Sequence, residues 1–216
     1  METRVKQGES LTRSAFLLAF DLRKDRLTQR GELGYLLRAA ALAELLLAGN
    51  LADESGKARA LTAPAAEPGS LPALVWEQIA GSPPRSWRRW VQKDHGKAVG
   101  VVRDELAAAR LISVERRRIL LFRVERITPR KAYLSRRLAE RVGAAVRGGR
   151  PVGRLDDDVR VLAALAAAAR LSTVVASRRE THLRRDRIQQ LSAPVEPIAT
   201  ALRKSIEAAR SASSAG

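Results

Sequence analysis

The sequence YLLRAAALAELLLAGN, residues 35–50, is alanine, leucine or another apolar residue at nearly every position. Alanine and leucine are strong helix formers, and Gly49 followed by Asn50 is typical of a helix C-terminus. We therefore predict a long helix over residues 32–48. This stretch makes a mainly helical fold the first expectation.

Arg38 interrupts this helix between apolar neighbours. A cation in that position has two common explanations. Its long side chain either extends along apolar surface until the guanidinium reaches water, or it reaches a specific anion. The spacing alone leaves both open.

The rest of the chain is also mostly helical in pattern, with one exception. Residues 53–70 contain glycines and prolines typical of a loop or a short irregular hairpin. Around residues 112–124 the period changes, which predicts two short strands joined by a charged turn at 115–118. Further helices are predicted at 71–80, 84–94, 97–110 and 128–147, after the acidic residues 156–158, at 184–191, and after Pro194.

The composition is that of a globular protein, with 45% hydrophobic and 29% charged residues in 216. We predict a single domain over residues 8–210, with flexible tails at 1–7 and 211–216. The chain has no cysteine, which excludes disulfides and thiolate metal sites. The longest apolar run, residues 161–169, is too short to span a bilayer. We expect a cytoplasmic protein.

Positive charge is in large excess, with 40 Lys and Arg against 23 Asp and Glu and a net charge of +17. Between Arg110 and Arg154 there are 14 Lys or Arg and 3 Glu, so 14 − 3 = +11 of this charge lies in that stretch. Such an excess indicates an anionic partner: nucleic acid, anionic lipid or an acidic protein.

No pattern in the sequence indicates catalysis. Asp156, Asp157 and Asp158 precede a helix, where carboxylates favour the positive end of the helix dipole. His95 and His182 lack the partners of a nucleophilic triad, and two histidines alone do not form a metal site. Gly31 and Gly34 lack the rest of a phosphate-loop pattern. We expect a protein that is not an enzyme and needs no cofactor or metal.

Several segments resemble the Golgi phosphoprotein 3 family, in the same order along nearly the whole chain. They are LLRAAALAELLLAGNL (36–51), SWRRWV (86–91), the helix and hairpin of 97–128 with its ILLF, DDDVRVLAALAAAARLSTVV (156–175) and LRRDRIQQL (183–191). The short N-terminus and the alanine- and arginine-rich style resemble the bacterial branch. The resemblance implies a helical bundle surrounded by amphipathic helices, with a projecting β-hairpin.

The resemblance also implies a lipid site. Eukaryotic members of the family are peripheral membrane proteins that bind phosphatidylinositol 4-phosphate through a tryptophan and several arginines. Arg38 matches one of these arginines, and the tryptophan position falls near Gln29. The two later arginines fall at Gly96 and Val99, with Lys97 and Arg103 as nearby cations. This gives Arg38, Gln29, Lys97 and Arg103 as candidate headgroup residues.

The hairpin is the second candidate contact with a membrane. Its sequence places the apolar Leu120, Leu121 and Phe122 beside the arginines at 116–118, namely Arg116, Arg117 and Arg118. The arginines suit lipid phosphates, while the apolar side chains suit the membrane interface, and two weak signals together give stable binding. The alternative is that the apolar run packs against the body of the protein or forms a homo-oligomer.

The expected function is therefore that of a peripheral membrane protein binding anionic phospholipid. The main rival is a nucleic-acid-binding protein, since a helix followed by an arginine-rich hairpin also resembles a winged-helix element. Aromatic residues are only 4% of the chain, and no helix offers an obvious base-reading face, which disfavours nucleic acid. A third reading is an adaptor for the acidic tails of membrane enzymes.

Overall fold

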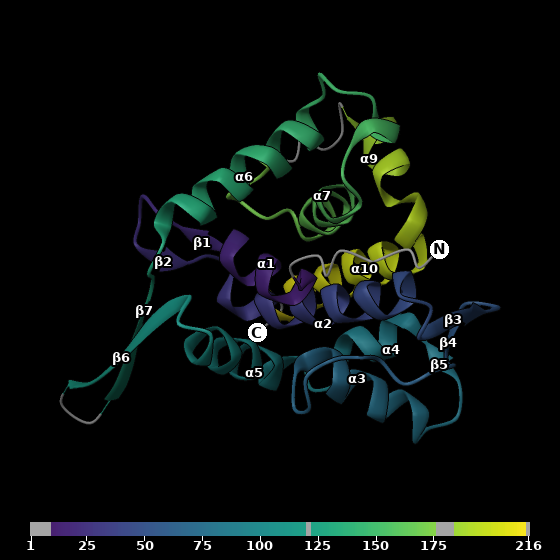
Figure 1. The fold of residues 1–216 in the computed structure, drawn as a ribbon, viewed down its shortest axis with the longest axis horizontal. Coiled ribbons are helices and arrows are strands. Elements are labelled where there is room, and N and C mark those ends of the chain that lie inside the picture. The colour runs from purple at the N-terminus through teal and green to yellow at the C-terminus, as the bar shows by residue number, and fades with distance from the viewer. Residues whose placement is uncertain (1–9, 120–121, 176–183, 215–216) are drawn as a thin grey trace, which may run out of the picture.

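A computed structural model describes residues 10–119, 122–175 and 184–214. The described chain is mainly helical, with short antiparallel strands, as the sequence predicted (Figure 1). The helices are α1 (Leu11–Leu18), α2 (Arg30–Leu47), α3 (Leu71–Ala80), α4 (Trp87–Gln92), α5 (His95–Ala108), α6 (Ala132–Arg147), α7 (Asp157–Ala169), α9 (Arg185–Ser192) and α10 (Glu196–Ser213), with 3-10 turns η1 (Val152–Arg154) and η2 (Ala193–Val195). The strands are β1 (Phe20–Asp21), β2 (Arg26–Leu27), β3 (Leu51–Glu54), β4 (Lys57–Ala60), β5 (Arg85–Ser86), β6 (Ile112–Ile119) and β7 (Phe122–Pro129).

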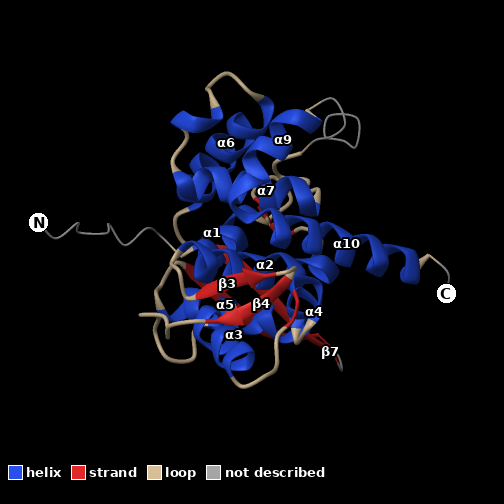
Figure 2. Ribbon diagram, turned by 90° about the vertical axis from the view of Figure 1, so that its right-hand side faces the viewer, coloured by secondary structure: helices blue, strands red, loops and turns tan. Residues whose placement is uncertain are grey.

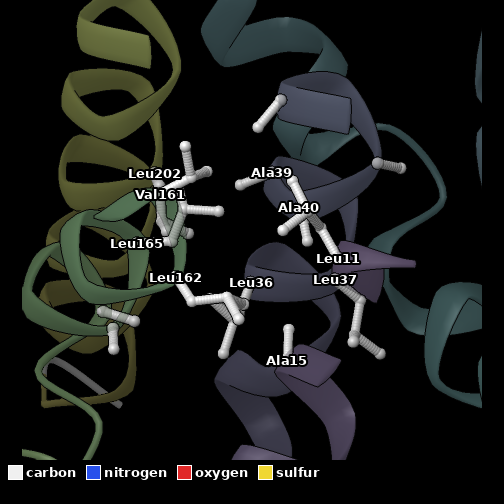
Figure 3. Packing of buried hydrophobic residues seen from close by; sticks show 14 of the residues in the cluster. Leu11, Ala15, Leu36, Leu37, Ala39, Ala40, Val161, Leu162, Leu165 and Leu202 are labelled. Atoms are coloured by element: carbon white, nitrogen blue, oxygen red, sulfur yellow. The ribbon is translucent and has the colours of Figure 1, made fainter. Parts of the chain in front are cut away.

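The central element is α2, within two residues of the predicted helix at each end. It contacts α1, α3, α4, α5, α7 and α10, and nearly all of its side chains between Leu36 and Leu45 are buried. Alanines on α2 let the neighbouring helices approach closely. In Figure 3, Leu36, Ala39 and Ala40 lie opposite side chains of α7 and α10, among them Leu162 and Leu202. The apolar stretch quoted first is therefore the core of the fold.

The β6–β7 hairpin projects from the helical body (Figure 1) and is longer than the sequence predicted. The charged turn expected at 115–118 is wrong, because these residues belong to β6. Glu115 pairs opposite Arg126 and Arg116 opposite Glu125, and opposite charges across a ladder favour strand pairing. Ile119 consequently ends β6 and Phe122 opens β7, so most of the expected second strand from 119 to 124 is divided between the two strands.

Two predicted helix starts are also corrected. The helix expected from residue 128 begins at Ala132, because Thr128 and Pro129 still belong to β7. The helix expected at 84–94 begins at Trp87, because Arg85 and Ser86 pair with β4 as strand β5. It ends at Gln92; Lys93 is extended, Asp94 has a left-handed backbone, and α5 follows.

The tryptophans of this region pack in the core. Trp87 and Trp90 are 3% and 1% exposed, and Trp76 packs at the edge of the same core. The Trp87 indole nitrogen donates a hydrogen bond to Asp53 of β3. These contacts fix the short helix α4 against α2 and the β3–β5 sheet, which Figure 2 shows beside α4.

The acidic residues 156–158 lie at the start of α7, as predicted. Asp156 is the residue before the helix, and Asp157 with Asp158 occupies its first turn. The Asp156 carboxylate makes no side-chain hydrogen bond to the helix end and instead accepts one from Arg141 at 2.6 Å. The three carboxylates therefore interact with the N-terminus of α7 electrostatically.

Glu44 joins α1 to α2, and its titration gives the first prediction. Its Oε2 atom accepts hydrogen bonds from the Leu11 backbone N–H at 2.9 Å and the Ser10 hydroxyl at 3.0 Å. Burial raises the pKa of Glu44 above its usual 4.5, against the opposing effect of these hydrogen bonds. The folded state then holds this proton more tightly than the unfolded state, so the contribution of Glu44 to stability declines as pH rises through the raised pKa.

Replacing Glu44 with glutamine keeps an oxygen for both donors and removes the titration. We expect the free energy of unfolding of E44Q to fall less between pH 4.5 and neutrality than that of the wild type. Denaturant unfolding across this range measures it, with the exposed Glu77→Gln as control. Parallel curves for E44Q and wild type would show that burial of the carboxylate has no such effect.

Among the described residues, no helix combines the length and the apolar character needed to cross a bilayer.

Candidate functional site

Arg38 lies inside the protein rather than at its surface. The side chain is 1% exposed. Its Nε and Nη2 atoms donate hydrogen bonds to the Trp90 carbonyl at 3.0 and 2.8 Å, and Nη1 donates to Gln78 Oε1 at 3.0 Å. The guanidinium therefore holds the last turn of α4 against α2.

Burial lowers the pKa of Arg38 from its ordinary value to about 10, and the nearby Asp94 carboxylate partly opposes this effect. The side chain is therefore still charged at neutral pH. Neither explanation offered by the sequence describes these contacts, since the guanidinium reaches neither water nor an anion but a backbone carbonyl. Its assignment as a headgroup ligand stays a prediction.

Gln29 lies at the N-terminal end of α2, whereas Arg38 lies in the middle of that helix. Gln29 precedes α2 with a left-handed backbone, φ 47°. Its side-chain amide donates to the Ala169 carbonyl at 3.3 Å and accepts from the Ser172 N–H at 3.2 Å, so it links α2 to the end of α7. Nine residues of helix separate Gln29 from Arg38, a rise of about 14 Å. These two candidates do not converge on one anion.

Lys97 and Arg103 lie on α5 and have acidic partners. Lys97 is an exposed side chain 3.1 Å from Asp94. Arg103 is 2.9 Å from Asp104 and 2.6 Å from Glu125 of β7. Because Glu125 belongs to the hairpin, Arg103 fastens the hairpin base to α5. Arg38, Gln29 and Arg103 thus make contacts that hold elements together, while Arg38 and Lys97 both lie near Asp94.

The hairpin candidates divide into two groups. Leu120 and Leu121 lie outside the described residues. Arg116, Arg117 and Arg118 belong to β6, and Phe122 opens β7. In the register Arg118 is opposite Arg123 and Ile119 is opposite Phe122, so arginines occupy the distal part of the hairpin on both strands.

The sequence analysis missed one further basic site. A pocket of about 310 Å³ is lined by Ser82, Arg85, Arg89, Trp90, Gln92 and Lys93. Its three cations are four residues apart in the sequence, but only Arg89 lies on a helix, since Arg85 belongs to β5 and Lys93 follows α4. The regular spacing of three cations in a short segment was the available signal, but it does not show that a strand and a helix bring them around one pocket.

A second pocket differs in its charge balance. It has a volume of about 740 Å³ and lies between α7, α9 and α10, with Arg170, Arg185 and Arg203 among its lining residues. Arg170 and Arg203 both pair with Glu207, at 3.5 and 3.6 Å. Its positive charge is therefore partly neutralised within the protein.

Comparison with known proteins gives one match. A search of curated proteins found none. The Golgi phosphoprotein 3 (GPP34) family matches the chain over residues 11–209, from the start of α1 into the last turns of α10. The match therefore includes the α2 core, the hairpin and both pockets, and the chain belongs to the Golgi phosphoprotein 3 family.

Proposed function

We propose that this protein is a peripheral membrane protein that binds anionic phospholipid. Membership of the Golgi phosphoprotein 3 family supports the proposal. The observation that carries it is the hairpin, which projects from the helical body (Figure 1) and whose sequence contains Arg116, Arg117 and Arg118 on β6 and Arg123 and Arg126 on β7. The charge of +17 gives the attraction to an anionic surface.

The hairpin has the reach and the charge to contact a membrane. Strands of eight residues extend about 27 Å at 3.4 Å per residue. Arg118 lies opposite Arg123 in the strand register. Each basic side chain close to an anionic membrane contributes about 1 kcal/mol, and the apolar residues at the distal end add a hydrophobic contribution.

The finer proposals extend this function. The headgroup we propose is phosphatidylinositol 4-phosphate, and the location is the cytoplasmic face of a membrane. We further infer that the chain belongs to the bacterial branch of the family, from its alanine- and arginine-rich composition. Acidic tails of membrane enzymes and a second copy of the chain at the hairpin are the protein partners to test.

Cosedimentation with vesicles tests the function directly. We expect the wild-type protein to pellet with vesicles rich in phosphatidylserine and to stay in solution with purely phosphatidylcholine vesicles, because only the former attract the basic surface. Equal partition with both would remove the electrostatic basis of the proposal. Binding to duplex DNA without binding to either vesicle would favour the nucleic-acid alternative.

A further inference from the structure

We propose that the pocket lined by Ser82, Arg85, Arg89 and Lys93 is a binding site for a phosphate monoester. The geometry of the pocket supports an anion site independently of the proposed function. The expectation that its ligand is the headgroup of a membrane lipid rests on the proposed function. None of the four residues is among those that the family resemblance assigned to the lipid.

The pocket has the dimensions and the lining of a small-anion site. Its volume, about 310 Å³, is at the lower end of the range of ligand pockets. Arg85 comes from β5, Arg89 from α4, and Lys93 directly follows α4. A strand and a helix thus bring three cations around one hollow, and Ser82 adds a hydroxyl.

The three cations carry unbalanced charge. Other arginines of the described chain have carboxylate partners, such as Arg103 with Glu125 and Arg210 with Glu32. Within the described ranges, no ion pair links Arg85, Arg89 or Lys93 to a carboxylate. An external anion would therefore gain their attraction without displacing an internal partner.

The carboxylate beside Lys93 is already engaged. Asp94 lies 3.1 Å from Lys97 and accepts a hydrogen bond from Gln78 at 3.2 Å. The hydrogen bond with Lys97 is the main cause that lowers the pKa of Asp94, and the charges of Lys93 and Arg38 lower it further. Asp94 is thus an anion at neutral pH, but it is a single negative charge among several cations.

Buried contacts hold the base of the pocket in place. Arg38 holds the Trp90 carbonyl from within the core, and the Ser86 hydroxyl accepts a hydrogen bond from the Arg89 N–H at 3.4 Å. Trp90 and Val91 are 1% and 0% exposed. The backbone that carries the cations is thereby fixed before a ligand arrives, which reduces the ordering cost of binding.

This arrangement suits a phosphate monoester better than a diester. A monoester carries close to two negative charges at neutral pH and three acceptor oxygens. Arginine donates to two such oxygens at once, and lysine and serine supply further donors. A diester, as in phosphatidylserine, has one charge and fewer free oxygens. The pocket is therefore expected to distinguish these two classes of phosphate.

The test compares Arg89→Gln with Arg88→Gln in the full-length protein. Both residues are exposed on α4 and both changes remove one positive charge, but only Arg89 lines the pocket. The probes are inorganic phosphate in solution, vesicles containing phosphatidylinositol 4-phosphate, and phosphatidylserine vesicles of equal surface charge. We expect R89Q to weaken binding of the first two about tenfold or more, and R88Q to resemble the wild type.

The outcomes separate the pocket from the membrane function. If R89Q loses binding to both inorganic phosphate and the phosphorylated lipid, while its binding to phosphatidylserine is unchanged, the result supports a pocket whose ligand is a lipid headgroup. If R89Q loses binding to inorganic phosphate and the wild-type protein binds none of the vesicles, the pocket has a soluble ligand. That result would overturn the membrane function. Equal behaviour of R88Q and R89Q, or no phosphate binding by the wild type, overturns the pocket.

Discussion

Replacing Arg38 with methionine is expected to lower the free energy of unfolding by about 2–4 kcal/mol. The change removes both donors to the buried Trp90 carbonyl and the donor to Gln78. A buried acceptor without a partner costs about 1–3 kcal/mol, and the contact between α2 and α4 weakens as well. Methionine keeps most of the aliphatic volume, so the loss is that of polar contacts. Denaturant unfolding measures it.

Arg88→Met is the matched control, because it makes the same change on an exposed position of α4. Surface substitutions of this kind usually change stability by no more than about 0.5 kcal/mol. If R38M is as stable as R88M, the buried guanidinium does not hold α4. In that case the preorganisation attributed to it in the basic pocket also fails.

The second large effect is expected at the distal end of the hairpin. Replacing Leu121 and Phe122 with serine should remove the part of vesicle binding that persists at high salt. Full burial of one such side chain is worth about 1.5–3 kcal/mol, so the loss is about tenfold or more if both enter the membrane interface. The part of binding due to the arginines should remain, and it should still decrease as salt increases.

Cosedimentation at low and high salt measures this effect, together with thermal unfolding and solution mass. The control is the double variant Leu47→Ser and Leu61→Ser, which changes exposed apolar side chains at the β3–β4 end of the molecule, 46% and 51% exposed. Unchanged high-salt binding by a folded L121S/F122S protein would reject insertion. Unfolding, or a fall in solution mass, would show instead that this run packs within the protein or between two copies.

Much of the fold could be predicted because the local signals agree with the tertiary structure. The apolar stretch around residues 35–50 is both a strong helix former and the buried centre of the molecule. The hairpin was harder to predict. Its charged residues suggested a turn, and only the cross-strand partners, Glu115 with Arg126 and Arg116 with Glu125, explain why they belong to a strand.

The candidate site could be predicted less well, because it depends on contacts between distant residues. The pattern around Arg38 suggested a surface or ligand-binding cation, whereas its partner is the carbonyl of a residue 52 positions away. Arg210, near the end of the chain, donates two hydrogen bonds to Glu32 at 2.6 Å across 178 positions. A local sequence pattern does not indicate such distant partners. It therefore does not indicate which cations remain available for a ligand.

The most direct test of the central claim is vesicle cosedimentation of the full-length wild-type protein across a salt series, with a duplex DNA titration under the same conditions. The account predicts binding to phosphatidylserine vesicles that weakens as salt rises, because exposed charges are screened over about 8 Å at physiological ionic strength. It also predicts weaker binding to DNA than to these vesicles at each salt concentration. Tight DNA binding without vesicle binding at the same salt would contradict the assignment of an anionic membrane as the partner.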